Sequence, residues 1–159
     1  MTSAPQGGPL LREALAAIAA DVDAGFDALL PVPDDGRARL FEAMRHATIG
    51  GGKRLRPLLL VAVAGLHGVG RETAMRAALA IEAVHAFSLV HDDLPCMDDD
   101  AMRHGKPSVH KAFDEATAVL AGDGLMAFAF EILSDSQYFP DPFIRAELVR
   151  CLAVASGPA

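Results

Sequence analysis

Five aspartates lie close together in the segment HDDLPCMDDD, and they are the first sign of chemistry in this chain: Asp92, Asp93, Asp98, Asp99 and Asp100. Two like unit charges about 4 Å apart repel by ~1 kcal/mol in water and by ~4 kcal/mol at an effective dielectric constant of about 20. Such a cluster at the end of an apolar helix is unfavourable unless a cation binds among the carboxylates. Mg²⁺ is commonly held by one or two carboxylates plus substrate phosphates, so the segment predicts a Mg²⁺ site.

Two basic segments accompany the acidic one. In GGGKRLRP, residues 50–57, Lys53 and Arg56 are three residues apart at an expected helix start. Free N–H groups there attract anions, and glycines let a ligand approach the backbone. In MRHGKPSVHK, residues 102–111, the basic side chains are Arg103, His104, Lys106, His110 and Lys111. Together, the acidic and basic segments predict a ligand that carries both phosphate and a metal ion.

Each segment also has a simpler explanation. The aspartates would form a solvated turn, the glycine-rich segment a helix start with solvated cations, and the second basic segment a charge balance for the aspartates. His91 and His110 are individually more often structural than catalytic. No Ser/His/Asp or Cys/His arrangement is evident, which argues against acyl transfer. The helix before the aspartates is apolar, so we expect its end to be buried. Burial increases the repulsion among the clustered carboxylates, which favours the interpretation that a cation binds there.

Apolar residues at helical spacing predict an all-α protein. The expected helices cover residues 10–30, 36–50, 53–69, 71–94 and 114–136, and another begins after Pro142. The helix over 53–69 is apolar almost all round, so we expect it to be buried. Residues 95–107 form the expected loop that carries the polar chemistry, and no hairpin signal is seen. We expect residues 1–8 to be disordered and residues 9–159 to form part of a single domain.

Composition excludes several classes of function. A net charge of −7 argues against nucleic acid as a partner. Cys96 and Cys151 lack metal or redox spacing, which indicates reduced thiols and a cytoplasmic protein. The N-terminus lacks the basic and apolar regions of a signal peptide, and no apolar run approaches the length of a bilayer span. We therefore predict no membrane insertion.

The segments GGKRLRP, HDDLPCMD and RHGKPSVHKAF, in this order and spacing, resemble the signature of the trans-polyprenyl diphosphate synthases. Within that family the chain is most similar to the bacterial farnesyl diphosphate synthases (geranyltranstransferases). The resemblance covers the chain from about Leu10 onward. It implies the isoprenoid synthase helical bundle, with only its N-terminal helices in this sequence, because nothing here matches the family's second aspartate-rich motif.

The resemblance also implies roles for individual residues. The catalytic set it implies is Asp92, Asp93, Asp98 and Arg103, with Mg²⁺ held by Asp92 and Asp98. The residues implied to hold isopentenyl diphosphate are Lys53, Arg56 and His85. Those implied to hold the allylic diphosphate are Arg103 and His104, where His104 replaces the arginine usual in the family. The implied reaction is Mg²⁺-assisted ionisation of the allylic diphosphate, attack by the isopentenyl double bond, and loss of a proton.

The resemblance implies that Phe87 and Ser88 set the length of the product. In the family, the residues four and five positions before the first aspartate form a wall of the product tunnel. A bulky Phe87 favours farnesyl diphosphate, from a geranyl or dimethylallyl primer. Two alternatives stay open: a synthase of geranylgeranyl or other-length products, and a non-catalytic subunit that binds diphosphates. A plain Mg²⁺- or Ca²⁺-binding helical protein would leave the Lys53/Arg56 pair unexplained. We expect a homodimer, as in the family, and no catalysis by these 159 residues alone.

Overall fold

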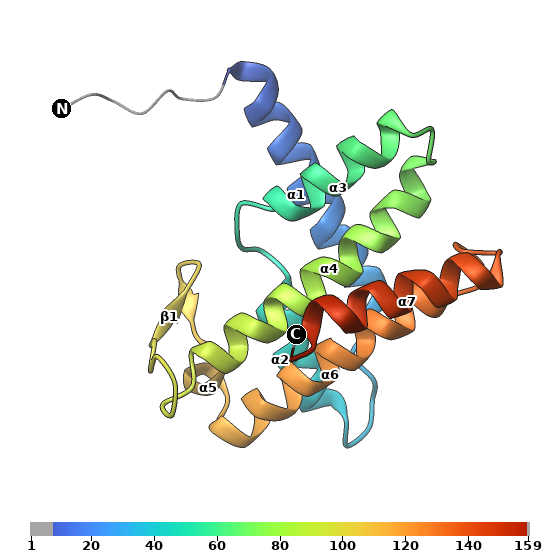
Figure 1. Ribbon diagram of the computed structural model, residues 1–159. Helices are drawn as coiled ribbons and strands as arrows, with labels where there is room; N and C mark the ends of the chain where they lie inside the picture. Colours follow the sequence, from blue (N-terminus) through green and yellow to red (C-terminus); the bar gives the residue numbers. More distant parts are fainter. Residues whose placement is uncertain (1–7, 159) are drawn as a thin grey trace.

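The computed structural model describes residues 8–158, which form seven helices and one small antiparallel sheet (Figure 1). The helices are α1 (Pro9–Leu29), α2 (Ala38–Thr48), α3 (Leu55–Leu66), α4 (Arg71–Asp92), α5 (Val109–Ala112), α6 (Glu115–Ser134) and α7 (Pro142–Ser156). The strands are β1 (Met102–Arg103) and β2 (Lys106–Pro107). The predicted all-α class is confirmed. The predicted disorder falls on residues outside those described, except for Gly8, which is the N-cap of α1.

Capping residues set where two of the long helices begin. The Asp114 carboxylate accepts a 2.7 Å hydrogen bond from the Thr117 N–H at the start of α6. Asp141 accepts from the N–H groups of Phe143 and Ile144 at the start of α7, where proline occupies the first helical position. Side-chain acceptors of this kind satisfy N–H groups that have no partner within the helix. These helix starts are therefore encoded locally.

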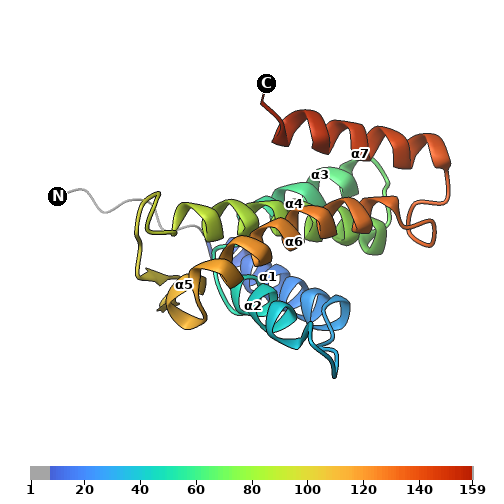
Figure 2. The same cartoon turned by 90° about the horizontal axis from the view of Figure 1, so that it is seen from below.

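The helices lie in three layers, with α7 on one side, α3, α4 and α6 in the middle, and α1 and α2 on the other side (Figure 2). The α4–α6 pair makes the most extensive contact in the described chain. Both helices bury several alanines, whose small side chains leave room for close packing; they include Ala78, Ala83 and Ala86 on α4, and Ala118, Ala121 and Ala129 on α6. The largest fully buried apolar side chains are Phe26, Leu30, Leu79 and Leu125. The long central helix α4 carries the functional residues to one end of this core.

Two predictions about the fold are wrong. The helix at 53–69 is not buried: α3 packs against α4 and α1, and four of its large apolar residues are exposed, namely Leu55, Leu59, Val63 and Leu66. A hairpin also lies within the predicted loop. Its turn consists of His104 and Gly105, with φ of 52° and 79°, as in the tight turns that match strand twist. Strands of two residues are too short to show alternation in the sequence.

The two central helices α4 and α6 are more apolar than the sequence analysis indicates. By length and composition alone, α4 and α6 are each apolar enough to cross a membrane, contrary to the expectation that no segment would be. They are also each other's main packing partners, and core helices often meet the same criterion. The prediction of no membrane insertion therefore stays a prediction.

Candidate functional site

The acidic segment folds back on the end of α4. Asp92 is the last residue of that helix, and Asp93 is its C-cap. The Asp98 N–H donates a 2.8 Å hydrogen bond to the Asp92 carbonyl, and the N–H groups of Met97 and Asp99 donate to the Leu94 carbonyl. The loop therefore brings Asp98 next to Asp92, although the two are six positions apart in the sequence.

The carboxylates of Asp92 and Asp98 are free within residues 8–158, since neither forms an ion pair or hydrogen bond there. Asp98 is exposed and Asp92 is half-buried. The same residues contain no group of three or more His, Cys, Asp or Glu side chains arranged to hold a metal ion. One free carboxylate at the end of α4 and one on the loop that folds back on it nevertheless fit Mg²⁺. Mg²⁺ typically takes one or two carboxylates and completes its octahedron with phosphates and water. The fit thus depends on a phosphate-bearing ligand.

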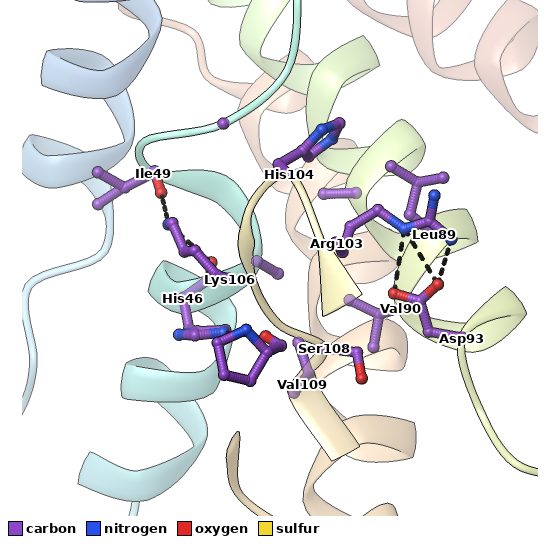
Figure 3. Close-up of a pocket in the computed structure, with 14 residues that line it drawn as sticks. His46, Ile49, Leu89, Val90, Asp93, Arg103, His104, Lys106, Ser108 and Val109 are labelled. Carbon is purple, nitrogen blue, oxygen red and sulfur yellow. Dashed lines mark hydrogen bonds and ion pairs between the residues drawn. The ribbon is translucent and has the colours of Figure 1, made fainter. Parts of the chain in front are cut away.

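Asp93 has a different environment. Its side chain is 3% exposed and accepts hydrogen bonds from Arg103 Nε at 3.0 and 3.2 Å, together with a further bond from Nη2 (Figure 3). Arg103 Nη2 also donates to Asp100 at 2.9 Å. The hydrogen bonds that Arg103 donates to Asp93 raise the pKa of the guanidinium above its usual range. The Asp93 carboxylate is therefore already used to hold the hairpin against α4.

The other strand of the hairpin is tied to α2. Lys106 Nζ donates to the Ile49 carbonyl, and His46 Nε2 lies 2.8 Å from the Pro107 carbonyl oxygen (Figure 3). A small cavity remains between α2, α4 and the hairpin, with Arg103 and Lys106 among its lining residues. The hairpin is thus anchored on both sides, which fixes the direction of its turn.

That turn contributes to a second site, a cleft of about 270 Å³ beside the glycine-rich segment. Its lining includes Lys53 and Arg56 from the start of α3, His85 from α4 and His104 from the hairpin turn. The structure therefore brings together all three residues implied to hold isopentenyl diphosphate, and adds His104. A Cβ atom on Gly51 would lie 3.0 Å from the His104 Cβ atom, so the glycine allows this close approach.

The two histidines of the cleft favour their neutral forms. Burial is the main cause that lowers the pKa of His85, followed by the positive charge of Arg56. Burial also lowers the pKa of His104, followed by the charge of Arg103. Lys53 and Arg56 are exposed basic side chains of the cleft. The cleft therefore has the charge and donors to bind an anionic group such as a diphosphate.

Arg54 was missed by the sequence interpretation. It lies between Lys53 and Arg56 but is buried, and it forms ion pairs with Glu82 on α4 and Asp23 on α1. A signal was present: Glu82 interrupts an otherwise apolar stretch of the helix, and a buried carboxylate requires a partner. Periodicity alone does not show which of the neighbouring cations provides it.

Phe87 and Ser88 lie on α4, one to two turns before the acidic segment. The Phe87 ring packs edge-on against the His91 ring, with 4.9 Å between centroids and 74° between planes. His91 Nε2 is 3.1 Å from the Val119 carbonyl oxygen on α6. Ser88 donates a 2.9 Å hydrogen bond to the His85 carbonyl within its own helix. Phe87 therefore has a defined neighbour in His91, and its role in product length stays a prediction.

Known proteins resemble this chain in sequence and in structure. The sequence profile of the polyprenyl synthetase family matches residues 37–155. The chain is 51% identical over 124 residues to the farnesyl diphosphate synthase of Haemophilus influenzae, covering 76% of this chain and 40% of that protein. It is 49% identical over 115 residues to the chloroplastic heterodimeric geranylgeranyl pyrophosphate synthase large subunit 1 of Arabidopsis thaliana, covering 72% of this chain and 30% of that protein.

A solved structure gives the same result. The crystal structure of an FPP/GFPP synthase from Zymomonas mobilis superposes with a TM-score of 0.91 and 57% identity, covering 93% of this chain and 53% of that chain. The present chain thus spans about half of that structure and about two-fifths of the Haemophilus protein. These relatives include makers of products of different length.

Proposed function

Because this chain belongs to the polyprenyl synthetase family, we propose that the protein is a prenyltransferase that joins isopentenyl diphosphate to an allylic diphosphate. Its helices have the arrangement of the isoprenoid synthases. The observation that supports this function best is the pair of adjoining sites on either side of the hairpin. Arg103 faces the acidic loop, while the next residue, His104, faces the basic cleft.

In the proposed reaction, Lys53, Arg56 and His85 bind and orient isopentenyl diphosphate in the basic cleft. We place His104 at this same diphosphate, in preference to the allylic one suggested by the resemblance, because it lines the cleft with the other three residues. A neutral His104 donates one hydrogen bond where an arginine would donate two in parallel, so its hold is weaker. Fixed orientation of one reactant beside another is a main source of rate enhancement.

The acidic loop would hold the second reactant. Asp92 and Asp98 would bind Mg²⁺, whose contribution when bound is to neutralise the charge that develops on the departing diphosphate. Asp93 keeps Arg103 at the edge of this loop, where the guanidinium can donate to the allylic diphosphate. The allylic C–O bond then ionises, the isopentenyl double bond attacks the carbocation, and a proton is lost to the departing diphosphate.

We propose farnesyl diphosphate as the product, from a geranyl or dimethylallyl primer, with Phe87 limiting chain growth. A longer product is the second candidate, because relatives named as geranylgeranyl synthases match this chain as well as a farnesyl synthase does. A non-catalytic diphosphate-binding subunit is less consistent with the free Asp92 and Asp98. A homodimer, a cytoplasmic location and the inactivity of these 159 residues alone stay predictions.

Turnover by the complete natural protein tests this proposal. We expect geranyl and isopentenyl diphosphates to give farnesyl diphosphate by chromatography when Mg²⁺ is present, and no product after chelation. Asp98→Asn should abolish turnover without loss of folding, measured by circular dichroism. A folded protein that turns over no allylic primer with isopentenyl diphosphate would refute the proposal.

A further inference from the structure

The segment that carries Lys53 and Arg56 is held in place by Arg54, which directly follows Lys53. Arg54 precedes α3 with φ 49° and ψ 33°, a left-handed conformation that is unfavourable for a residue with a side chain. It is also only 6% exposed, whereas both neighbouring cations are exposed. An unfavourable backbone and a buried charge persist at one residue only when the surrounding contacts compensate for them.

Those contacts join three elements. Arg54 Nη1 donates to Glu82 on α4 at 2.8 Å, and Nη2 donates to Asp23 on α1 at 2.9 Å. Nη2 also donates to the Thr48 carbonyl at the end of α2. Glu82 is itself buried at 4% exposure. A planar guanidinium can bridge acceptors in several directions in this way, whereas a lysine ammonium is a single point charge.

The position of Glu82 connects this network to the cleft. Glu82 and His85 are three residues apart on α4 and therefore share a face of the helix. The Arg54–Glu82 pair thus fixes the glycine-rich segment against α4 one turn from His85. It also compensates the negative charge of Glu82, which lines the same cleft and would otherwise repel an anion.

We propose that Arg54 is a positioning residue for the diphosphate cleft. It sets Lys53 and Arg56 in register with His85, and it neutralises Glu82. Arg54 also borders the cleft, but its terminal nitrogens are held by Glu82, Asp23 and the Thr48 carbonyl. This inference rests on the proposed function for the identity of the ligand, isopentenyl diphosphate. It assigns the three basic residues of the segment to two different tasks: Lys53 and Arg56 bind the ligand, and Arg54 positions them.

The test compares Arg54→Met, Arg54→Lys and the double variant Arg54→Met/Glu82→Gln in the complete natural protein. Displacement of a binding group by about 1 Å can reduce rates ~100-fold, so we expect Arg54→Met to raise KM for isopentenyl diphosphate by ~10-fold to ~100-fold. KM for the allylic diphosphate should change little. Arg54→Lys should fall between wild type and Arg54→Met. The double variant should recover part of the affinity, because the carboxylate that lines the cleft, Glu82, is then replaced by a neutral amide.

Arg45→Met is the matched control. Arg45 also bridges helices, with a 2.9 Å bond to the Leu30 carbonyl and an ion pair to Asp27, but it does not line the cleft. It should lower the melting temperature and leave both KM values unchanged. If Arg54→Met lowers the melting temperature and leaves both KM values unchanged, as expected for Arg45→Met, or raises both KM values equally, Arg54 is merely structural and the inference is wrong. Should Arg54→Met fail to fold, an unchanged KM for isopentenyl diphosphate in Arg54→Lys would overturn the inference equally.

Failure of the proposed function gives a different pattern. If the wild-type protein turns over no pair of prenyl diphosphates, calorimetry with inorganic diphosphate still measures the cleft. Weaker diphosphate binding in Arg54→Met than in Arg45→Met would then support the positioning role. Equal affinities in these two variants would refute it.

Discussion

The aspartates of the acidic segment should separate into two classes when they are replaced individually by asparagine. Asp93 is buried and accepts three hydrogen bonds from Arg103, whereas Asp98 is exposed and its carboxylate has no partner among the described residues. We therefore expect Asp93→Asn to lower stability and to leave the Mg²⁺ ligands in place. Asp98→Asn should leave stability unchanged and remove a Mg²⁺ ligand.

The structure indicates the size of the first effect. Removing one partner of a fully buried ion pair costs about 3–5 kcal/mol, and a hydrogen bond to a charged group contributes about 1.5–3 kcal/mol. The Arg103 side chain is 32% exposed, so water compensates part of the loss, and asparagine keeps one acceptor. We expect Asp93→Asn to cost about 2 kcal/mol, which lowers the melting temperature of a domain of this size by about 4–8 °C.

Thermal unfolding with and without Mg²⁺ and inorganic diphosphate is the assay. A ligand present at about 100 times its Kd stabilises the folded state by about 2.7 kcal/mol, which is a readily measured shift. Without ligand, Asp93→Asn should have a lower melting temperature than the wild type, and it should keep this ligand-induced shift. Without ligand, Asp98→Asn should have the melting temperature of the wild type, and it should lose most of the ligand-induced shift. The reasoning fails if Asp98→Asn is as destabilised as Asp93→Asn, or if the shift disappears only in Asp93→Asn.

Three further outcomes are expected. Gly122→Ala should lower the free energy of unfolding in urea by about 1–3 kcal/mol, since its Cβ atom would lie 2.1 Å from His91 Nε2; a neutral result would show that the ring moves aside freely. Burial lowers the pKa values of His85 and His104 below their ordinary 6.5, so the unfolded state binds more protons. The stability that these two histidines contribute should accordingly be complete above pH 6.5 and be lost as the pH falls through their lowered pKa values. Melting temperatures that do not fall as the pH drops below 6.5 would contradict this. Phe87→Ala should lengthen the product of the complete protein in chromatography, and an unchanged product would refute its role as a wall.

Local sequence signals predicted most of the helical framework. The helix expected at 71–94 is α4, Arg71–Asp92, and the helix expected at 114–136 is α6, Glu115–Ser134. Pro95 after one and the Asp114 cap before the other act within a few residues, so their effect is visible in the sequence. The hairpin was not predicted, because its two-residue turn is defined by positive φ at His104 and Gly105 and not by any apolar pattern.

The sequence by itself determined which residue types are available for binding metal and phosphate, and in what order along the chain. Only the tertiary structure decided which of two neighbouring charged residues is paired within the protein and which is free to bind a ligand. Asp93 pairs with Arg103 while Asp92 stays free, and Arg54 is buried against Glu82 while Lys53 faces the cleft. The reason is physical: whether a charge is free or compensated depends on partners supplied by distant segments and on burial. Adjacent residues of the same type are alike in the sequence until the fold gives them different surroundings.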